Sequence, residues 1–374
     1  MKFQSTYLNK KINFLMIKKN FWKNKRVFIT GHTGFKGGWL SIWLKLLGAH
    51  VTGYSLKPNT NPNLFHLTNL GNYIDKSYIK DVTNISDLKK AIINSKSTIL
   101  FHLAAQPSVR YSYKNSYETV ETNILGSVNI LEILKIKSEI KSVVMIATDK
   151  VYENKEKKIS FKEESPLGGT DIYSASKACS EILVNAYRSS FFNNTKINIG
   201  SARSGNVIGG GDWTLDRIVP DCLNSFSKNK KLIIRYPRSI RPWQHVLEPL
   251  YGYLLLSEKL YSKKGVNFSK AWNFGPKKEN NTNVYELAKR LKKITNSKSK
   301  IVTTKLKNFS EAKYLYLDSS KSMKFLKWKK MLNLKQTLNL IDEWHQAFLK
   351  KKDLRKITIS QIEYFTKALN EKKI

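Results

Sequence analysis

The chain has 374 residues, 41% of them hydrophobic, which is enough for one large α/β domain with a lobe or for two domains. Its two cysteines exclude a disulfide framework, show no metal-ligand spacing and indicate a reducing, cytoplasmic setting, and no apolar run is long enough to span a bilayer. The formal net charge of +38 would suit nucleic acid, but the lysines are scattered and no nucleic-acid-binding motif is present, so we favour a compositional origin and expect no specific nucleic-acid partner.

The first 24 residues are basic and lack clear periodicity, so we expect a flexible N-terminal extension. From residue 25 the pattern alternates between strand and helix. The expected strands are 27–30, 51–55, 78–81, 98–103, 142–148 and 197–203, the last of which closes the sheet. The expected helices are 39–47, 86–94 with Ser86 as its N-cap, 116–134 and 173–188. Strands separated by helices of this length pair in parallel, so residues 25–205 are predicted to form a doubly wound α/β domain of the Rossmann type.

After residue 205 the pattern changes. Helices are expected at 218–227, 249–260 and 284–294, with short strands at 233–236 and 271–274. We interpret residues 206–374 as a smaller α/β lobe that folds against the sheet and binds the substrate.

A glycine-rich turn, Gly-His-Thr-Gly-Phe-Lys-Gly at 31–37, follows the first strand and opens the first helix. The glycines let the backbone approach a pyrophosphate, and the helix N-terminus supplies N–H donors, so this turn predicts a dinucleotide site. Its expected contacts are Gly31, Thr33, Gly34, Phe35, Lys36 and Gly37. Asp81 and Val82, after the third strand, are a candidate adenine contact or an ordinary turn. The second strand ends without a carboxylate and is followed by Lys57, so both NAD and NADP stay open.

Two short motifs carry the chemistry. Thr148-Asp149-Lys150 ends the fifth strand, and Tyr173 and Lys177 lie one helical turn apart on one face of a helix. The second pair is typical of hydride transfer at an alcohol carbon, whereas Asp149 and Lys150 add an acid and a base that a plain dehydrogenase does not need. Each motif alone is also common in turns or on solvated helices; their order after successive strands favours the joint interpretation.

Together with His-Leu-Ala-Ala-Gln at 102–106, these motifs resemble the extended short-chain dehydrogenase/reductases. Three further strings, GHTGFKGGW at 31–39, GGGDW at 209–213 and RPWQHV at 241–246, are similar to those of the nucleotide-sugar 4,6-dehydratases, in the branch that acts on CDP-glucose. The resemblance covers about residues 21–344, and Lys150 stands where the dTDP-glucose and GDP-mannose branches carry glutamate. It implies cofactor contacts from Leu103, Ala104 and Ala105, an NAD cofactor, a homodimer or homotetramer, and a role in deoxysugar and lipopolysaccharide O-antigen synthesis.

The resemblance also implies a role for each motif residue. Tyr173 would take the proton of the C4 hydroxyl, helped by Lys177, which would lower the phenol's pKa and hold the nicotinamide ribose. Thr148 would hold the C4 oxygen. Lys150, kept neutral by burial and nearby positive charge, would remove the C5 proton, and Asp149, kept protonated by burial, would protonate the departing C6 hydroxyl. CDP-glucose would become CDP-4-keto-6-deoxyglucose and water.

Polar residues after the fourth strand and in the lobe are the expected substrate contacts, because ligands bind at the carboxyl ends of parallel strands and arginine suits a pyrophosphate. They are Gln106, Ser108, Arg110, Asn206, Arg217, Arg235, Arg241 and His245.

Two alternatives stay open. A nucleotide-sugar 4-epimerase shares Tyr173, Lys177 and the glycine turn but has no need of Asp149 and Lys150. A catalytically silent dinucleotide-binding protein would use the positive charge to bind RNA and would not need Tyr173 and Lys177.

Overall fold

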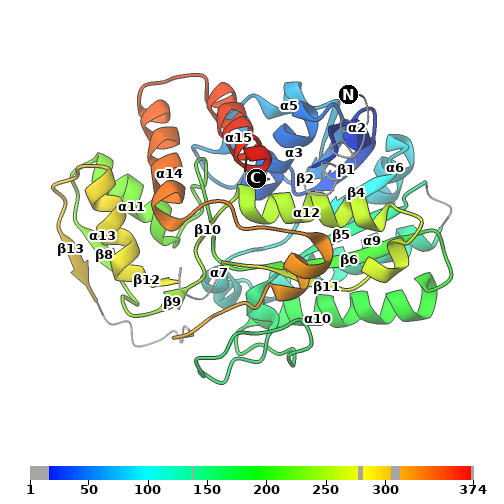
Figure 1. The fold of residues 1–374 in the computed structure, drawn as a ribbon. Coiled ribbons are helices and arrows are strands. Elements are labelled where there is room, and N and C mark those ends of the chain that lie inside the picture. The colour runs from blue at the N-terminus through cyan, green and yellow to red at the C-terminus, as the bar shows by residue number, and fades with distance from the viewer. Residues whose placement is uncertain (1–16, 137–138, 277–280, 305–311, 372–374) are drawn as a thin grey trace, which may run out of the picture.

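A computed structural model describes residues 17–136, 139–276, 281–304 and 312–371. At its centre is a seven-stranded parallel sheet with the order β11-β6-β5-β4-β1-β2-β3 (Figure 1). The strands are β1 (Arg26–Thr30), β2 (His50–Ser55), β3 (Lys76–Ile79), β4 (Ile99–His102), β5 (Ser142–Thr148), β6 (Asn198–Ser204) and β11 (Ala271–Phe274). The predicted doubly wound fold is confirmed, and the strand order reverses between β1 and β4, where such sheets open a crevice for ligands.

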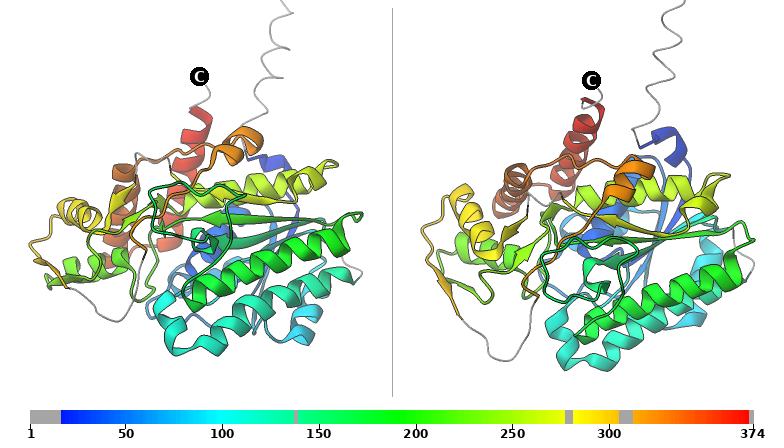
Figure 2. Two further views of the ribbon diagram at one scale, coloured as in Figure 1. Left: turned by 90° about the horizontal axis from the view of Figure 1, so that it is seen from below. Right: turned by 60° about the horizontal axis from the view of Figure 1, so that its bottom comes forward.

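Helices cover both faces of the sheet (Figure 2). One layer contains α3 (Phe35–Leu46), α12 (Leu247–Leu260) and α15 (Leu354–Glu371); the other contains α6 (Ile85–Ser95), α8 (Ser116–Val120), α9 (Gly126–Lys135) and α10 (Ile172–Tyr187). In β1, Val27 and Ile29 pack into the first layer and Phe28 into the second, because successive side chains of a strand point to opposite faces. Among the described residues, no helix is both long and apolar enough to cross a membrane.

The helices of the second layer differ in detail from the prediction. The expected helix 116–134 is one run in which a π-helical turn, Glu121–Leu125, joins α8 to α9, and a second π-helical turn, Arg188–Phe192, follows α10. Helix α6 is capped by Asn84 rather than Ser86, because the Asn84 side chain accepts a hydrogen bond from the backbone N–H of Asp87, and Ser86 lies inside the first turn.

The lobe is built around three short two-stranded sheets. They pair β7 (Val207–Ile208) with β10 (Gln244–His245), β9 (Ile240–Arg241) with β12 (Thr282–Asn283), and β8 (Leu232–Ile234) with β13 (Ile301–Thr303). Helices α11 (Ile218–Ser227), α13 (Val284–Ile294) and α14 (Leu334–Leu349) bury an apolar core between them. Shorter elements are α2 (Lys19–Trp22), α4 (Leu64–Leu67), α5 (Leu70–Tyr73), α7 (Val109–Lys114), the 3₁₀ turns Asp149–Val151 and Gly265–Phe268, and the π-helical turn Ser322–Leu326.

The edge of the main sheet corrects one prediction. The strand expected at 197–203 does not close the sheet, because β11 pairs in parallel with β6 outside it, and β11 was expected in the lobe. Helix α12, also expected in the lobe, packs on β5 and β6. The chain therefore returns from the lobe to the sheet, where Trp272 and Phe274 of β11 bury their side chains.

The N-terminal segment also differs from the prediction. Residues 1–16 lie outside the described residues, but residues 17–24 are packed against the first helix layer rather than flexible. Trp22 of α2 is fully buried and its indole N–H donates to Glu258 of α12 at 2.9 Å. Burial raises the pKa of Glu258 to about 7.

Replacing Trp22 by alanine is expected to lower the free energy of unfolding by about 3 to 5 kcal/mol, because it empties a filled core site. Urea titration of the full chain measures this change. The exposed Lys19→Ala on the same helix is the control and should change the stability by less than about 0.5 kcal/mol. Equal midpoints for the two variants would mean that this segment does not belong to the folded core.

Candidate active site

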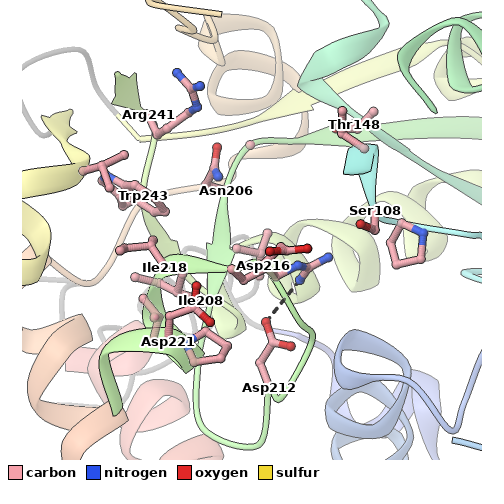
Figure 3. Close-up of a pocket in the computed structure, with 18 of the residues that line it drawn as sticks. Ser108, Thr148, Asn206, Ile208, Asp212, Asp216, Ile218, Asp221, Arg241 and Trp243 are labelled. Carbon is pink, nitrogen blue, oxygen red and sulfur yellow. Dashed lines mark hydrogen bonds and ion pairs between the residues drawn. The ribbon is translucent and has the colours of Figure 1, made fainter. Parts of the chain in front are cut away.

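A cavity of about 300 Å³ lies between the carboxyl ends of the central strands and the lobe. Figure 3 shows Thr148 and Ser108 on one side, Arg241 and Trp243 on the other, and Asp216 between them. The cavity is thus at the edge of the sheet where ligands are expected. Across the described ranges, no group of three or more His, Cys, Asp or Glu side chains is arranged to hold a metal ion.

The end of β5 brings the first predicted motif to the cavity. Thr148, Asp149 and Lys150 all line it, and the Thr148 hydroxyl donates to Oδ1 of Asp149 at 3.1 Å. Asp149 is only 3% exposed, and its Oδ2 has no hydrogen-bond partner among the described residues. Burial raises the pKa of Asp149 to about 6, against the opposing effects of Lys150, Thr148 and Arg241, which is the direction expected for an acid.

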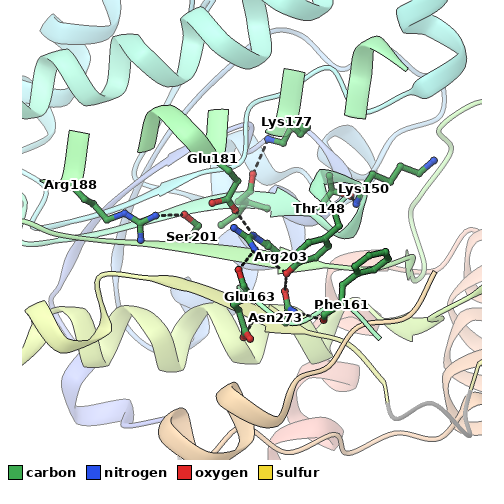
Figure 4. Close-up of polar contacts among 12 residues, drawn as sticks. Thr148, Lys150, Phe161, Glu163, Lys177, Glu181, Arg188, Ser201, Arg203 and Asn273 are labelled. Atoms are coloured by element: carbon green, nitrogen blue, oxygen red, sulfur yellow. Dashed lines mark hydrogen bonds and ion pairs between the residues drawn. The ribbon is translucent and has the colours of Figure 1, made fainter. Parts of the chain in front are cut away.

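Lys150 does not match its predicted environment. Its side chain is half-buried rather than enclosed, because the turn that follows β5 opens into the cavity. Figure 4 shows the Lys150 side chain extending away from the polar residues around Arg203.

The second motif lies on α10, which begins here because the Asp171 side chain accepts the N–H of Ser174 at 2.9 Å. Tyr173 lines the cavity. The ammonium of Lys177 instead donates a hydrogen bond to the carbonyl of Ile146 at 2.9 Å (Figure 4). Burial raises the pKa of Tyr173 to about 12, and hydrogen bonding with Thr148 partly opposes it. The Lys177 ammonium is directed at a backbone carbonyl, and its predicted lowering of the Tyr173 pKa in the complex with the cofactor stays a prediction.

A buried ion pair between Glu181 and Arg203 lies next to Lys177 on α10 and acts on its charge. The carboxylate of Glu181, one turn further along α10, accepts a hydrogen bond from the Nε of Arg203 at 2.9 Å (Figure 4). Arg203 also donates to the hydroxyl of Tyr152. Burial lowers the pKa of Lys177 to about 8, and the Glu181 carboxylate works against that lowering. This pair was not predicted from the sequence, although Glu181 stands four residues after Lys177 and so shares its helix face.

The glycine turn fits a dinucleotide. Gly31 has a φ of +78°, and a Cβ there would lie 2.7 Å from the backbone nitrogen of Ala104; a Cβ at Gly37 would lie 2.1 Å from the Gly31 carbonyl oxygen. Only glycine allows this packing, which sets the turn against residues 103–105. Gly34 is exposed, a Cβ on it would meet only one atom, at 3.4 Å, and it begins α3 without a side-chain cap. An open helix N-terminus beside exposed backbone is suited to a phosphate.

The other predicted cofactor residues divide into two groups. Phe35 and Lys36 line the cavity, so they lie on its substrate-facing wall as well as in the turn. The pKa of Lys36 falls to about 7 because of burial, Arg217 and Lys177, while Asp149 opposes the change. Thr33 instead ties the turn to β2, because its hydroxyl lies 2.8 Å from that of Ser55.

Asp81 and Val82 use their side chains locally. The Asp81 carboxylate accepts the N–H of Thr83 at 2.9 Å, as an ordinary turn aspartate does. Val82 is buried next to Gly126. Lys57, just beyond β2, is exposed.

Most of the predicted substrate residues do meet at the cavity. Those that line it are Ser108, Arg110, Asn206, Arg217, Arg235 and Arg241. Gln106 and His245 do not. The Gln106 amide donates to the Thr119 hydroxyl at 2.8 Å, and His245 is fully buried with its ring edge-to-face with Trp39, where burial lowers its pKa to about 3.

Three aspartates of the lobe were missed. Asp212 accepts from Arg217 at 3.1 Å, Asp216 contacts both Arg110 and Arg235, and Asp221 lies 3.7 Å from Arg235. All three line the cavity. Asp212 is the aspartate of the GGGDW string, whereas the only signal of Asp216 and Asp221 in the sequence is proximity to that string and to Arg217.

The buried Asp149 predicts a pH-dependent stability. Because its pKa rises from 3.8 to about 6, the folded protein holds this proton more tightly than the unfolded chain, so the contribution to stability is present at about pH 4 and lost as the pH rises through about 6. We expect Asp149→Asn to be more stable than the natural chain by up to about 3 kcal/mol near pH 8 and equal to it near pH 4. Urea titration at both pH values measures this, and a difference that does not change with pH would contradict it.

The parallel sheet, the glycine turn and the Tyr173–Lys177 pair define the class of extended short-chain dehydrogenase/reductases. The family described as GDP-mannose 4,6 dehydratase matches residues 28–341. A CDP-glucose 4,6-dehydratase of Salmonella typhimurium is 45% identical over 344 residues, which are 91% of this chain and 95% of that protein. The chain belongs to this family of nucleotide-sugar 4,6-dehydratases.

Solved structures share the fold. A UDP-glucose 4-epimerase of Thermotoga maritima, crystallised with UDP-glucose, superposes with a TM-score of 0.76 at 21% identity, over 86% of this chain and 99% of that one. A dTDP-glucose 4,6-dehydratase of Bacillus anthracis, in complex with NAD, has a TM-score of 0.73 at 19% identity, and the match covers 88% of this chain and 99% of that one.

Proposed function

We propose that this protein converts CDP-glucose to CDP-4-keto-6-deoxyglucose and water. The observation that carries the proposal is that Asp149 and Lys150 share one cavity with Tyr173, in a chain 45% identical to a CDP-glucose 4,6-dehydratase. Oxidation at C4 needs only Tyr173 and its helpers, whereas the loss of water needs an acid and a base as well.

NAD is the proposed cofactor, held by the glycine turn and the open N-terminus of α3. When bound, it supplies the hydride acceptor for C4 and the hydride donor for C6. NADP is the alternative, because Lys57 rather than a carboxylate follows β2.

Tyr173 and Thr148 act at the C4 oxygen. Tyr173 takes the hydroxyl proton, and Thr148, already hydrogen-bonded with Tyr173, holds the same oxygen. A phenol with a pKa of about 12 needs a lower pKa to act as a base near neutral pH, so the charge of Lys177 has to be felt at Tyr173 during the reaction.

Lys150 and Asp149 act one and two carbons further along the sugar. The C4 ketone acidifies the C5 proton, Lys150 removes that proton, and the electron pair forms the C5–C6 double bond. Asp149 gives its proton to the departing C6 hydroxyl, which leaves as water. An aspartate with a pKa of about 6 still carries that proton in part of the population near neutral pH.

We also propose a homodimer in the cytoplasm, with a homotetramer as the alternative. Helices α8–α9 and α10 lie side by side and expose large apolar side chains, including Tyr117, which is 80% exposed, and Ile182, which is 55% exposed. Such a paired-helix face is suited to a four-helix contact with a second copy. The cytoplasmic part of this proposal is supported by the low cysteine content, which suits a reducing compartment.

The test of the proposed function is incubation of the purified full chain with CDP-, dTDP-, UDP- and GDP-glucose in parallel. We expect the CDP-sugar to react fastest and its product to be lighter by one water. An unchanged mass with inverted C4 would indicate an epimerase, and a turnover that is equal for all four sugars would contradict the assignment to CDP-glucose.

A further inference from the structure

Two arginines from opposite walls of the cavity share one carboxylate. Arg110 belongs to α7 on the sheet side, and Arg235 follows β8 in the lobe. The Nη1 atom of each contacts Oδ1 of Asp216, and Arg235 also donates to the Asp216 backbone carbonyl at 3.4 Å. All three residues line the cavity, so Asp216 bridges its two walls.

The chemistry of this contact is that of phosphate recognition. Two guanidinium groups that converge on one anionic oxygen form the arrangement that binds phosphates and carboxylates alike. We infer that Asp216 is an internal stand-in for the diphosphate of the substrate: it holds Arg110 and Arg235 until a nucleotide diphosphate takes them from it. The inference rests on the proposed function, since that function makes the substrate a nucleotide diphosphate.

The turn that carries Asp216 is suited to such an exchange. It lies at the surface, with the neighbouring Leu215 79% exposed, and both ion pairs are partly open to water. Ion pairs of this exposure are weak, so a ligand that contacts both arginines can replace them. Asp216 has a φ of +63°, a left-handed conformation that aspartate and asparagine tolerate well.

Asp216 differs from the other carboxylates on this side. Asp212 pairs with Arg217 and Asp221 pairs with Arg235, whereas Asp216 alone among these three pairs with arginines of both walls. Displacing Asp216 therefore frees cations on both sides of the cavity for one ligand. Its return after the reaction would compete with the bound diphosphate and speed the release of the product.

The test uses Asp216→Asn in the full chain, because asparagine keeps the volume and tolerates the backbone conformation. We expect the dissociation constants of inorganic pyrophosphate and of CDP, measured by calorimetry, to fall by about three- to tenfold, the combined effect of two partly exposed ion pairs. Asp87→Asn, which removes the same charge from an ion pair with Lys80 on α6, is the matched control and should leave both constants unchanged. In a chain that also carries Arg110→Gln and Arg235→Gln, the gain from Asp216→Asn should disappear.

Unchanged or weaker binding of both ligands to Asp216→Asn would overturn the inference, because Asp216 would then position the arginines rather than compete for them. A gain that persists without the two arginines would overturn it as well. Tighter binding of pyrophosphate, with no binding of CDP to any variant, would support the stand-in role of Asp216 and contradict the proposed function.

Discussion

Replacing Tyr173 by phenylalanine is expected to lower kcat/KM for CDP-glucose by about a hundred- to ten-thousandfold, the usual contribution of a positioned acid or base. The phenol is the cavity-lining group assigned to the C4 hydroxyl, and the variant removes only its oxygen. Because the ring stays in place, binding of CDP-glucose should change by less than about threefold, so the loss falls on kcat. Steady-state kinetics and calorimetry measure the two effects separately.

Tyr253→Phe is the matched control. The Tyr253 side chain is fully buried and does not line the cavity itself; its hydroxyl lies 2.9 Å from that of Ser204, which does. The control removes the same atom from the same residue type, and we expect its kcat to stay within about threefold of the natural chain. A Tyr173→Phe variant no slower than this control would show that another group takes the C4 proton.

Replacing Lys150 by alanine is expected to lower the rate of water loss by about a hundred- to ten-thousandfold, because the C5 proton loses its base. The measurement is the product mass, together with the uptake of solvent deuterium at C5 in heavy water. We expect the amount of dehydrated product and the uptake of deuterium at C5 to fall together. CDP-glucose and NAD should still bind, since Lys150 is half-buried and its removal leaves the core intact.

Lys155→Ala, an exposed lysine a few residues further on, is the control for this variant. Its ammonium pairs with Glu153 at 3.2 Å, outside the cavity lining. Normal turnover by Lys150→Ala would contradict the assignment of Lys150 as the C5 base. Lys36, which also lines the cavity and whose pKa burial lowers to about 7, would then be the next candidate.

Most of the sheet was predictable because each strand and helix is encoded locally. The apolar runs at β1, β4 and β5 and the glycine turn between β1 and α3 are short-range signals, and parallel strands joined by helices leave few topologies. The position of β11 was not predictable in this way. The segment between β6 and β11 contains α11 and the lobe strands β7–β10 as well as α12, so no single strand–helix–strand unit indicates that the two strands pair.

The site shows the same division. Thr148, Asp149, Lys150 and Tyr173 meet because the carboxyl end of β5 and the start of α10 share one edge of the sheet. The hydrogen bond of Lys177 to the Ile146 carbonyl and the ion pairs of Asp216 depend on three-dimensional packing, which motif spacing does not encode. His245 is buried outside the cavity lining for the same reason: a motif fixes its position in the chain but not the direction of its side chain.

The most direct test of the account follows a deuterium atom placed at C4 of CDP-glucose. A 4,6-dehydratase removes hydrogen from C4 and returns it to C6 of the same sugar, so mass spectrometry and NMR of the product should show the loss of one water and the deuterium at C6. A product of unchanged mass that keeps deuterium at C4, or one that has lost water and deuterium together, would contradict it.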